Sequence, residues 1–270
     1  MCFGIDRTDV HLELDDETAL VTASTSGLGK ASATALAAEG ANVVLCGRDE
    51  ERLDAALDDV RKEAVGNVEG VSADITDPDD MAALVDATVE AFGGLDHLVL
   101  SAGGPPSGPF LDTDEGDWYD AYDLLVMSVV RAVKAAHPYL SESDAGTVTA
   151  ITSTSVETPI EGLVLSNAVR RGVIGLIETL AVELAPEIRA NAVLPGTFET
   201  PRIGSLVEQG VERGDYADYE SGIEEWGVGI PEGRVGDPRE LGDVVAFLAS
   251  ERASYVNGVS LPIDGGVLLE

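Results

Sequence analysis

The feature that most constrains the fold of this chain is the alternation of short β-branched segments with longer amphipathic ones. Strand-like segments lie at residues 18–22, 42–46, 68–73, 95–100, 146–152, 189–194 and 259–263. Helix-like segments begin near residues 29, 49, 77, 117, 165 and 237. This alternation is typical of parallel strands joined by helical crossovers that cover both faces of a sheet. We therefore predict an α/β fold with a doubly wound parallel sheet of about seven strands.

The chain is expected to form one domain over residues 1–270. Its length fits a single large α/β domain, and no repeat, low-complexity tract or linker divides it. Residues 1–16 are irregular, so we expect an N-terminal extension before the first strand. Residues 196–236 show only a weak pattern, and long segments of this kind in compact domains are typically functional. We expect residues 196–236 to form a substrate loop or lid.

A glycine-bearing turn follows the first strand and opens the first helix. It comprises Thr22, Ala23, Ser24, Thr25, Ser26, Gly27, Leu28 and Gly29. Gly27 and Gly29 allow a ligand to approach the backbone closely, and the N–H groups at a helix start favour a pyrophosphate. In doubly wound sheets a ligand binds where the first strand ends, which predicts a dinucleotide site of the Rossmann type. The motif alone leaves open the alternative of a glycine turn that binds nothing.

Further motifs in the same order resemble those of the short-chain dehydrogenase/reductase family, over residues 15–268. The turn at 22–29 is similar to the family's Thr-Gly-x-x-x-Gly-x-Gly, with Ala23 in place of the first glycine. Residues 101–103 correspond to its Asn-Ala-Gly, 191–196 to the stretch before its nicotinamide-side loop, and 262–266 to its terminal signature. The resemblance implies further cofactor contacts at Asp74, Ser101, Ala102, Gly103, Pro195, Gly196 and Thr200.

The end of the second strand indicates which dinucleotide is bound. A carboxylate there would bind the ribose hydroxyls of NAD and repel a 2′-phosphate. This chain has Gly47 followed by Arg48, whose guanidinium suits a phosphate. We therefore expect NADP(H) to be preferred, with NAD(H) as the second candidate. The alternative is that Arg48 is an exposed cation at the start of the next helix.

The resemblance also implies a catalytic set that this chain has largely replaced. Relatives use a serine, a tyrosine thirteen residues later and a lysine four residues beyond it, with an asparagine on the preceding long helix. Here Ser153 occupies the serine position, Ser166 the tyrosine position, Arg170 the lysine position and Ser128 the asparagine position. Arg170 can still bind ribose hydroxyls, but it does not exchange a proton near neutral pH. Loss of a general acid typically costs about 10²- to 10⁴-fold in rate.

Two functions follow from this comparison. The first is an NADP(H)-dependent oxidoreductase that transfers a hydride to or from a carbonyl or alcohol substrate. Ser153 would bind the substrate oxygen, with water, Ser166 or a lid tyrosine supplying the proton. The segment 165–170 resembles a branch labelled 3-oxoacyl-[acyl-carrier-protein] reductase-like. The second is a catalytically impaired nucleotide-binding protein that acts through cofactor-dependent conformation or partner binding.

Several polar and aromatic side chains near this region admit simpler explanations. The hydroxyls of Ser153, Ser155 and Ser166 can bond to backbone at a strand end and a helix start, and Asn167 can cap that helix. Aromatic residues occur at the start of the long helix and in the expected lid, where packing is their commoner role. They are Trp118, Tyr119, Tyr122, Tyr216, Tyr219 and Trp226. His11, His97 and His137 lack metal-ligand spacing, so no metal site is expected.

The charge of the chain excludes some partners and suggests a setting. The formal net charge is −34, from 50 acidic and 16 basic residues, and such a surface repels nucleic acid and anionic membranes. Self-repulsion of this size is relieved in concentrated salt, where the Debye length falls to about 3 Å at 1 M. The composition resembles that of haloarchaeal proteins, and we expect a high-salt cytoplasm.

The remaining expectations concern compartment and assembly. Two cysteines, Cys2 and Cys46, form no disulfide framework and favour a reducing compartment. No apolar run approaches the roughly 20 residues that span a bilayer, and residues 1–16 lack a signal-peptide apolar segment. The family resemblance implies a homotetramer or dimer packed through the long helix at 117–140 and the helix after residue 166.

Overall fold

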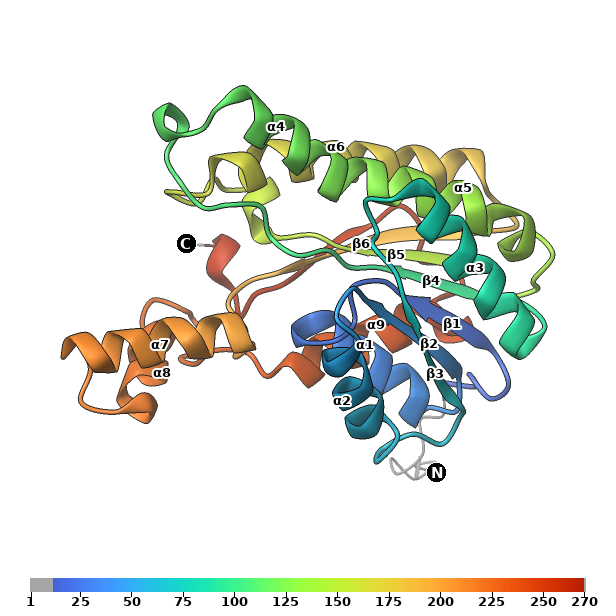
Figure 1. Cartoon of the computed structure of the whole chain (residues 1–270), viewed down its shortest axis with the longest axis horizontal. Helices are drawn as coiled ribbons and strands as arrows, with labels where there is room; N and C mark the ends of the chain where they lie inside the picture. The colour runs from blue at the N-terminus through green and yellow to red at the C-terminus, as the bar shows by residue number, and fades with distance from the viewer. Residues whose placement is uncertain (1–11, 270) are drawn as a thin grey trace, which may run out of the picture.

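The computed structural model describes residues 12–269, which are built around a seven-stranded parallel sheet (Figure 1). The strands are β1 (Thr18–Val21), β2 (Asn42–Gly47), β3 (Val68–Ser72), β4 (His97–Leu100), β5 (Thr147–Ile151), β6 (Arg189–Pro195) and β7 (Ser260–Ile263). Their order is β3-β2-β1-β4-β5-β6-β7. The chain therefore changes winding direction beside β1, between β1 and β4. The predicted doubly wound sheet of about seven strands is confirmed.

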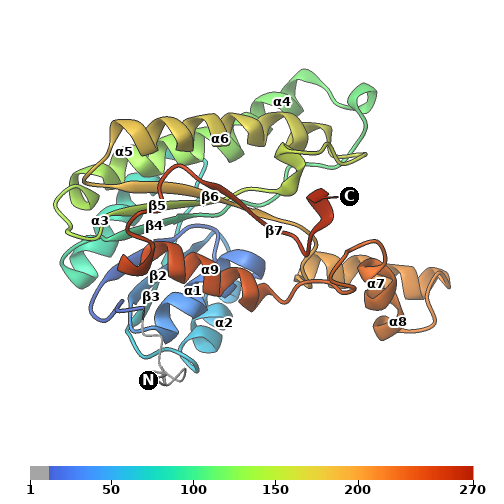
Figure 2. The ribbon, with the colours of Figure 1, turned by 180° about the vertical axis from the view of Figure 1, so that it is seen from behind.

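Helices cover both faces of this sheet (Figures 1 and 2). One face carries α1 (Gly27–Ala38), α2 (Glu50–Val60) and α9 (Pro238–Ala249). The other carries α3 (Pro78–Phe92), α4 (Glu115–Tyr122), α5 (Ser128–Leu140) and α6 (Val164–Glu183). Each layer buries its own apolar core, with Leu36 and Val245 in the first and Leu98 and Ile177 in the second. Short 3₁₀ turns lie at Phe110–Asp112, Thr154–Val156, Glu251–Ala253 and Val267–Leu269.

Local sequence fixes the starts of two of these helices. The side chain of Asp77 accepts hydrogen bonds from the backbone N–H groups of Asp79 and Asp80, and Pro78 occupies the first helical position. Asp237 forms a capping box with Glu240 at the start of α9. These side chains satisfy backbone donors that the helix itself leaves unpaired. Both predicted helix starts are confirmed.

The helix predicted at residues 117–140 is interrupted. α4 and α5 are joined by a π-helical turn over Asp123–Met127, and Ser128 begins α5 immediately afterwards. The Ser128 hydroxyl donates to Leu124 O at 2.6 Å, four residues back. A π-turn carries an extra residue without breaking the apolar face, so the hydrophobic pattern did not reveal it. The second helix is also shorter than the predicted 49–65, ending at Val60.

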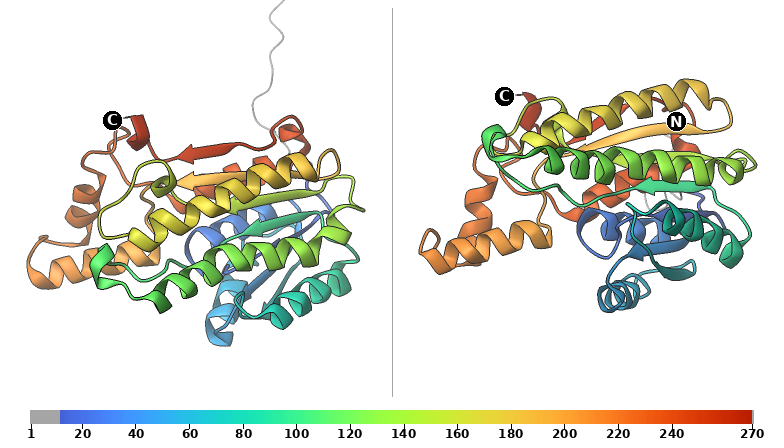
Figure 3. Two further views of the ribbon diagram at one scale, coloured as in Figure 1. Left: turned by 90° about the horizontal axis from the view of Figure 1, so that it is seen from above. Right: turned by 45° about the horizontal axis from the view of Figure 1, so that its top comes forward.

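Residues 196–236 are more regular than their weak pattern indicated. They contain α7 (Pro201–Arg213) and α8 (Tyr219–Gly227), which project from the body beside the strand ends (Figure 3). These helices bury few side chains: Val207 and Gly210 on α7 pack near Tyr216 and Gly222. The apolar residues of α7 nevertheless recur at helical spacing, at Ile203, Leu206, Val207 and Val211, so this helix was readable in the sequence and the prediction of an irregular loop missed it. That α7 and α8 form a substrate lid stays a prediction.

The expected N-terminal extension lies partly outside the described residues, because residues 1–11 are not among them. From residue 12 onward the chain joins the body: Leu14 is fully buried in the same core as α1. Cys46 is likewise fully buried, while Cys2 falls outside the described part. Within residues 12–269 no helix is both long and apolar enough to cross a membrane.

Candidate functional site

A cleft of about 570 Å³ lies at the carboxyl ends of the central strands. This is the position where doubly wound sheets bind ligands, since neighbouring crossovers leave the sheet in opposite directions there. Most residues predicted for the cofactor line the cleft. They are Thr25, Ser26, Gly27, Leu28, Gly29, Arg48, Asp74, Ser101, Ala102, Gly103, Arg170 and Thr200.

The glycine turn after β1 has the geometry of a phosphate cradle. Gly27 adopts a φ of +56°, in the left-handed region that favours glycine. A Cβ on Gly29 would lie 2.8 Å from Ala23 O, so a side chain there would force the turn apart. The turn therefore brings backbone N–H groups at the start of α1 to the cleft, as a pyrophosphate requires. Ala23 also has a positive φ, +46°.

Four residues predicted for the cofactor do not line this cleft. Thr22 Oγ1 donates to Ser101 O at 2.7 Å and accepts from Ser101 N at 2.8 Å, which ties the end of β1 to the end of β4. Ser24 Oγ donates to Val21 O at 2.7 Å and accepts from Cys46 N at 3.0 Å. These two hydroxyls therefore hold the strand ends. The other two are Pro195, which is buried, and Gly196, which packs against Asp264.

Arg48 and Asp74 face each other at one end of the cleft. Arg48 Nη1 lies 3.4 Å from Asp74 Oδ2, and the Arg48 side chain is 76% exposed. Burial acts to raise the pKa of Asp74, but hydrogen bonds from Thr76 and the charge of Arg48 outweigh it and lower that pKa. A Cβ on Gly47 would collide with the methyl group of Thr25, so any side chain at the end of β2 would require Thr25 to move. This end of the cleft offers a cation to an anionic group.

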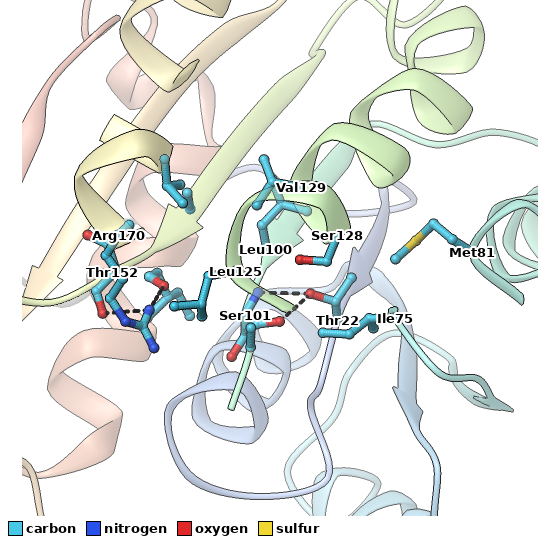
Figure 4. Close-up of a pocket in the computed structure, with 14 residues that line it drawn as sticks. Thr22, Ile75, Met81, Leu100, Ser101, Leu125, Ser128, Val129, Thr152 and Arg170 are labelled. Atoms are coloured by element: carbon cyan, nitrogen blue, oxygen red, sulfur yellow. Dashed lines mark hydrogen bonds between the residues drawn. The ribbon is translucent and has the colours of Figure 1, made fainter. Parts of the chain in front are cut away.

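Arg170 marks the other end of the cleft. Its Nη1 donates to Thr152 O at 3.2 Å and to Ile151 O at 3.4 Å (Figure 4). Its Nε donates to Ser166 Oγ at 3.2 Å. Nη2 takes part in none of these bonds. Burial, together with repulsion from Arg202, lowers the pKa of Arg170 to about 10. Arg170 therefore remains a cation at neutral pH.

The predicted catalytic serines lie near Arg170, but none of them lines the large cleft. Ser166 accepts from Arg170, while Ser153 accepts from Ser155 N at 3.1 Å and caps a 3₁₀ turn. Ser155 Oγ is buried without a hydrogen-bond partner among the described residues. Of the predicted catalytic set, only Arg170 lines the large cleft.

Ser128 lies instead on a small neighbouring cavity of about 20 Å³, whose polar wall includes Thr22, Thr152 and Arg170 (Figure 4). A cavity of this size holds about one water molecule when polar partners surround it. The cavity therefore offers a place for water beside Arg170.

The remaining candidate side chains serve other contacts. Tyr219 Oη donates to Glu199 at 3.0 Å, and burial together with that carboxylate raises the pKa of Tyr219. Tyr119 bonds to Glu115, and neither tyrosine lines the cleft. His97 is buried between Glu17 and Thr147. Asn167 bonds both backbone groups of Ile160 and so holds the loop before α6. Within residues 12–269, no His, Cys, Asp and Glu side chains cluster as metal ligands would.

Sequence reasoning missed two arginines of the cleft, Arg52 and Arg202. Arg202 is the second residue of α7, and its Nη2 donates to Ser107 Oγ, in the loop after β4, at 3.0 Å. The available signal was a basic residue two positions after Thr200 in a chain with few bases. Arg202 and the loop after β4 are about a hundred residues apart in the sequence, so no local pattern predicts that they meet.

Comparison with known proteins decides the family. Residues 22–268 match the family described as enoyl-(acyl carrier protein) reductase. The chain is 32% identical to dehydrogenase/reductase SDR family member 4 of Oryctolagus cuniculus, over 97% of this chain and 96% of that protein. This chain belongs to the short-chain dehydrogenase/reductase family. It is also 32% identical to the 3-oxoacyl-[acyl-carrier-protein] reductase FabG of Thermotoga maritima, over 96% of this chain and 100% of that protein.

Solved structures of two reductases share this fold. An L-sorbose reductase from Gluconobacter frateurii, complexed with NADPH and L-sorbose, superposes with a TM-score of 0.90 at 27% identity, covering 96% of this chain and 99% of that chain. A variant actinorhodin polyketide ketoreductase with NADPH gives a TM-score of 0.85 at 31% identity, covering 94% of this chain and 98% of that chain. Rossmann fold and oxidoreductase family are thus established for this chain.

Proposed function

We propose that this short-chain dehydrogenase/reductase is an NADP(H)-dependent oxidoreductase that acts on a carbonyl or alcohol substrate. The observation that carries the proposal is the cleft, which joins the glycine turn after β1 to Arg48 and has Gly47 rather than an acid at the end of β2. The two structural neighbours named above were solved with NADPH. NAD(H) is the second candidate cofactor, since Asp74 also borders the adenosine end.

The residues present fit a dinucleotide along the length of the cleft. The backbone at Gly27–Gly29 would hold the pyrophosphate, and Arg48 with Arg52 would hold a 2′-phosphate. Arg170 and Thr200 border the opposite end, where the ribose and nicotinamide would lie. When bound, this cofactor supplies or accepts the hydride.

The reaction also requires that one proton be added to, or removed from, the substrate oxygen, and the protein's own residues must assist this transfer. In reduction, the carbonyl oxygen gains a proton as its carbon gains the hydride. Ser166 accepts from Arg170, which lines the cleft, and its O–H donates to none of the described residues, so that O–H is free to turn toward a substrate oxygen held beside Arg170. We propose that Ser166 and Ser153 orient that oxygen and that water supplies the proton. Tyr219 is a poorer donor, because its pKa is raised and it is bonded to Glu199.

The reaction is tested by following NADPH oxidation with a panel of ketones and 3-oxoacyl thioesters in molar KCl. Turnover on any member supports the oxidoreductase, and the thioesters test the 3-oxoacyl-type activity suggested by segment 165–170. A second candidate follows from Ser166 and Arg170, which lack an ionisable proton donor. If NADPH binds and no substrate turns over, the protein is a nucleotide-binding protein that acts through cofactor-dependent conformation or a partner.

We further propose a homodimer or homotetramer that works in concentrated salt in the cytoplasm. α4 and α6 carry exposed apolar side chains, Tyr119 at 67% and Val182 at 79%, on the helices that the family resemblance places between subunits. The net charge of −34 makes the folded chain repel itself, and salt weakens this repulsion because it shortens the Debye length. Light scattering gives the assembly, and thermal unfolding in increasing KCl tests the salt requirement. Indifference of the unfolding temperature to KCl would contradict the second part.

A further inference from the structure

Two arginines of the cleft, Arg170 and Arg202, form no ion pair with any carboxylate of residues 12–269. Within residues 12–269, most lysines and arginines lie within 4.0 Å of a carboxylate: Lys30, Arg48, Arg52, Arg61, Lys62, Arg131, Arg213, Arg234, Arg239 and Arg252. Neither Arg170 nor Arg202 lies within that distance of an Asp or Glu carboxylate of residues 12–269. Their charges are therefore uncompensated in the same cleft.

Two other arginines that form no ion pair among residues 12–269 bind backbone carbonyls and so hold segments of the fold together. Arg189 donates to backbone carbonyls at the carboxyl end of α9, and Arg171 donates to Glu157 O. Arg202 differs, because its hydrogen bond is to the Ser107 hydroxyl at 3.0 Å and both residues are exposed. A guanidinium has five N–H donors, so this single bond leaves most of its donor capacity unused.

The position of Arg202 is specific. A Cβ on Gly104 would lie only 2.7 Å from Arg202 Nη1, so the guanidinium rests against bare backbone of the loop after β4. Arg202 is near enough to Arg170 to contribute to the lowering of the pKa of Arg170. Two cations that repel each other across a cleft are stabilised when an anion lies between them.

The phosphates of a dinucleotide have other partners in the cleft. The start of α1 would hold the pyrophosphate. Arg48 and Arg52, at the end of the cleft near β2, would hold a 2′-phosphate. Arg170 and Arg202 lie instead with Ser101, Thr152 and Gly104, at the ends of β4 and β5. That is the end where the substrate must meet the hydride.

We propose that the substrate is a carbonyl or alcohol compound carrying an anionic group, a carboxylate or phosphate, held by Arg202 together with Arg170. This inference rests on the proposed function and names its substrate class. The planar guanidinium fork matches both kinds of anion through paired hydrogen bonds. A local pair of cations also lets an anion enter a protein whose net charge of −34 otherwise repels it.

The test compares anionic substrates with neutral counterparts of similar shape. The pairs are acetoacetate with its methyl ester, and dihydroxyacetone phosphate with dihydroxyacetone. Wild type should show the higher kcat/KM on the anionic member of at least one pair. Arg202→Gln should lower that preference about 10- to 100-fold, the loss typical of a hydrogen bond to a charged group. Arg213→Gln, on the same helix but paired with Asp215 away from the cleft, is the matched control.

Binding measurements separate the possible failures. Calorimetric titration of succinate and its dimethyl ester into the NADP⁺ complex reports the anion site without turnover. Succinate binding that Arg202→Gln weakens, with no turnover of any substrate, supports the anion site and removes the proposed oxidoreductase function. Turnover of the neutral members with no anionic preference overturns the anion site alone. If Arg202→Gln weakens NADPH binding and leaves the anionic preference intact, Arg202 serves the cofactor phosphates and the inference is wrong.

Discussion

Ser166 and Arg170 lie one helical turn apart on α6, and Arg170 Nε donates a hydrogen bond to Ser166 Oγ over 3.2 Å. The same guanidinium bonds the carbonyls of Ile151 and Thr152 at the end of β5. One cation thus joins helix, strand and cleft. The arrangement holds a hydroxyl in place but provides no side chain that readily gives up a proton near neutral pH.

Restoring an ionisable pair should therefore raise turnover. We expect Ser166→Tyr combined with Arg170→Lys to increase kcat about 10²-fold or more on the best substrate, because a positioned general acid typically contributes that much. Steady-state NADPH oxidation measures it. Ser166→Phe with Arg170→Lys is the matched control, since it adds the ring without the hydroxyl. Equal rates in the two double variants would show that the phenol is not the source of any gain.

Arg48 should determine the choice between the two dinucleotides. Arg48→Gln removes the cation beside Asp74 and should weaken NADPH binding about 10-fold while leaving NADH binding nearly unchanged. Fluorescence titration with each cofactor measures both dissociation constants, with Arg213→Gln as control. Equal losses for NADPH and NADH would mean that Arg48 does not contact a 2′-phosphate.

Ala23 should be a strained position in the cradle. Its φ of +46° is costly for any residue with a Cβ, by roughly 1–2 kcal/mol, whereas glycine adopts it freely. After allowing for the larger unfolded-state entropy of glycine, Ala23→Gly should raise the free energy of unfolding by about 0.5–1 kcal/mol. Denaturant unfolding in molar KCl measures the change. Ala35→Gly, inside α1, should instead lower that free energy by about 1 kcal/mol.

Glu240 should stabilise the protein only above acid pH. The hydrogen bond from Arg234, with that from Asp237 N, lowers the pKa of Glu240 to about 2 from an ordinary 4.5. Because the folded state binds the proton less tightly, the stabilisation is present above pH 4.5 and is lost as the pH falls toward 2. The pair is exposed, so the effect is within about 1 kcal/mol.

The measurement is the difference in unfolding free energy between wild type and Glu240→Gln across this pH range. Taking a difference removes the general relief of acidic repulsion, which affects both proteins. Glu224→Gln, on the exposed part of α8, serves as the control substitution. A difference that grows as the pH falls would have the wrong sign for this ion pair.

Much of the site followed from short motifs because the backbone there is determined locally. Gly27 and Gly29, the Asp77-Pro78 helix start and the strand-helix alternation each act within a few residues, so the sheet and the cofactor cradle were predictable. Individual side chains were less so. Thr22 and Ser24 have the residue types of phosphate contacts, yet they bond strand ends whose neighbours are distant in sequence.

The sequence by itself determined the sheet, its helical layers and the glycine cradle, since periodicity and backbone preference are properties of neighbouring residues. Only the tertiary structure decided which side chains face the cleft. It placed Arg202 against Gly104 and Ser107, and it inserted a π-turn before Ser128. These outcomes depend on packing between segments far apart in the chain, where burial and charge outweigh local preference.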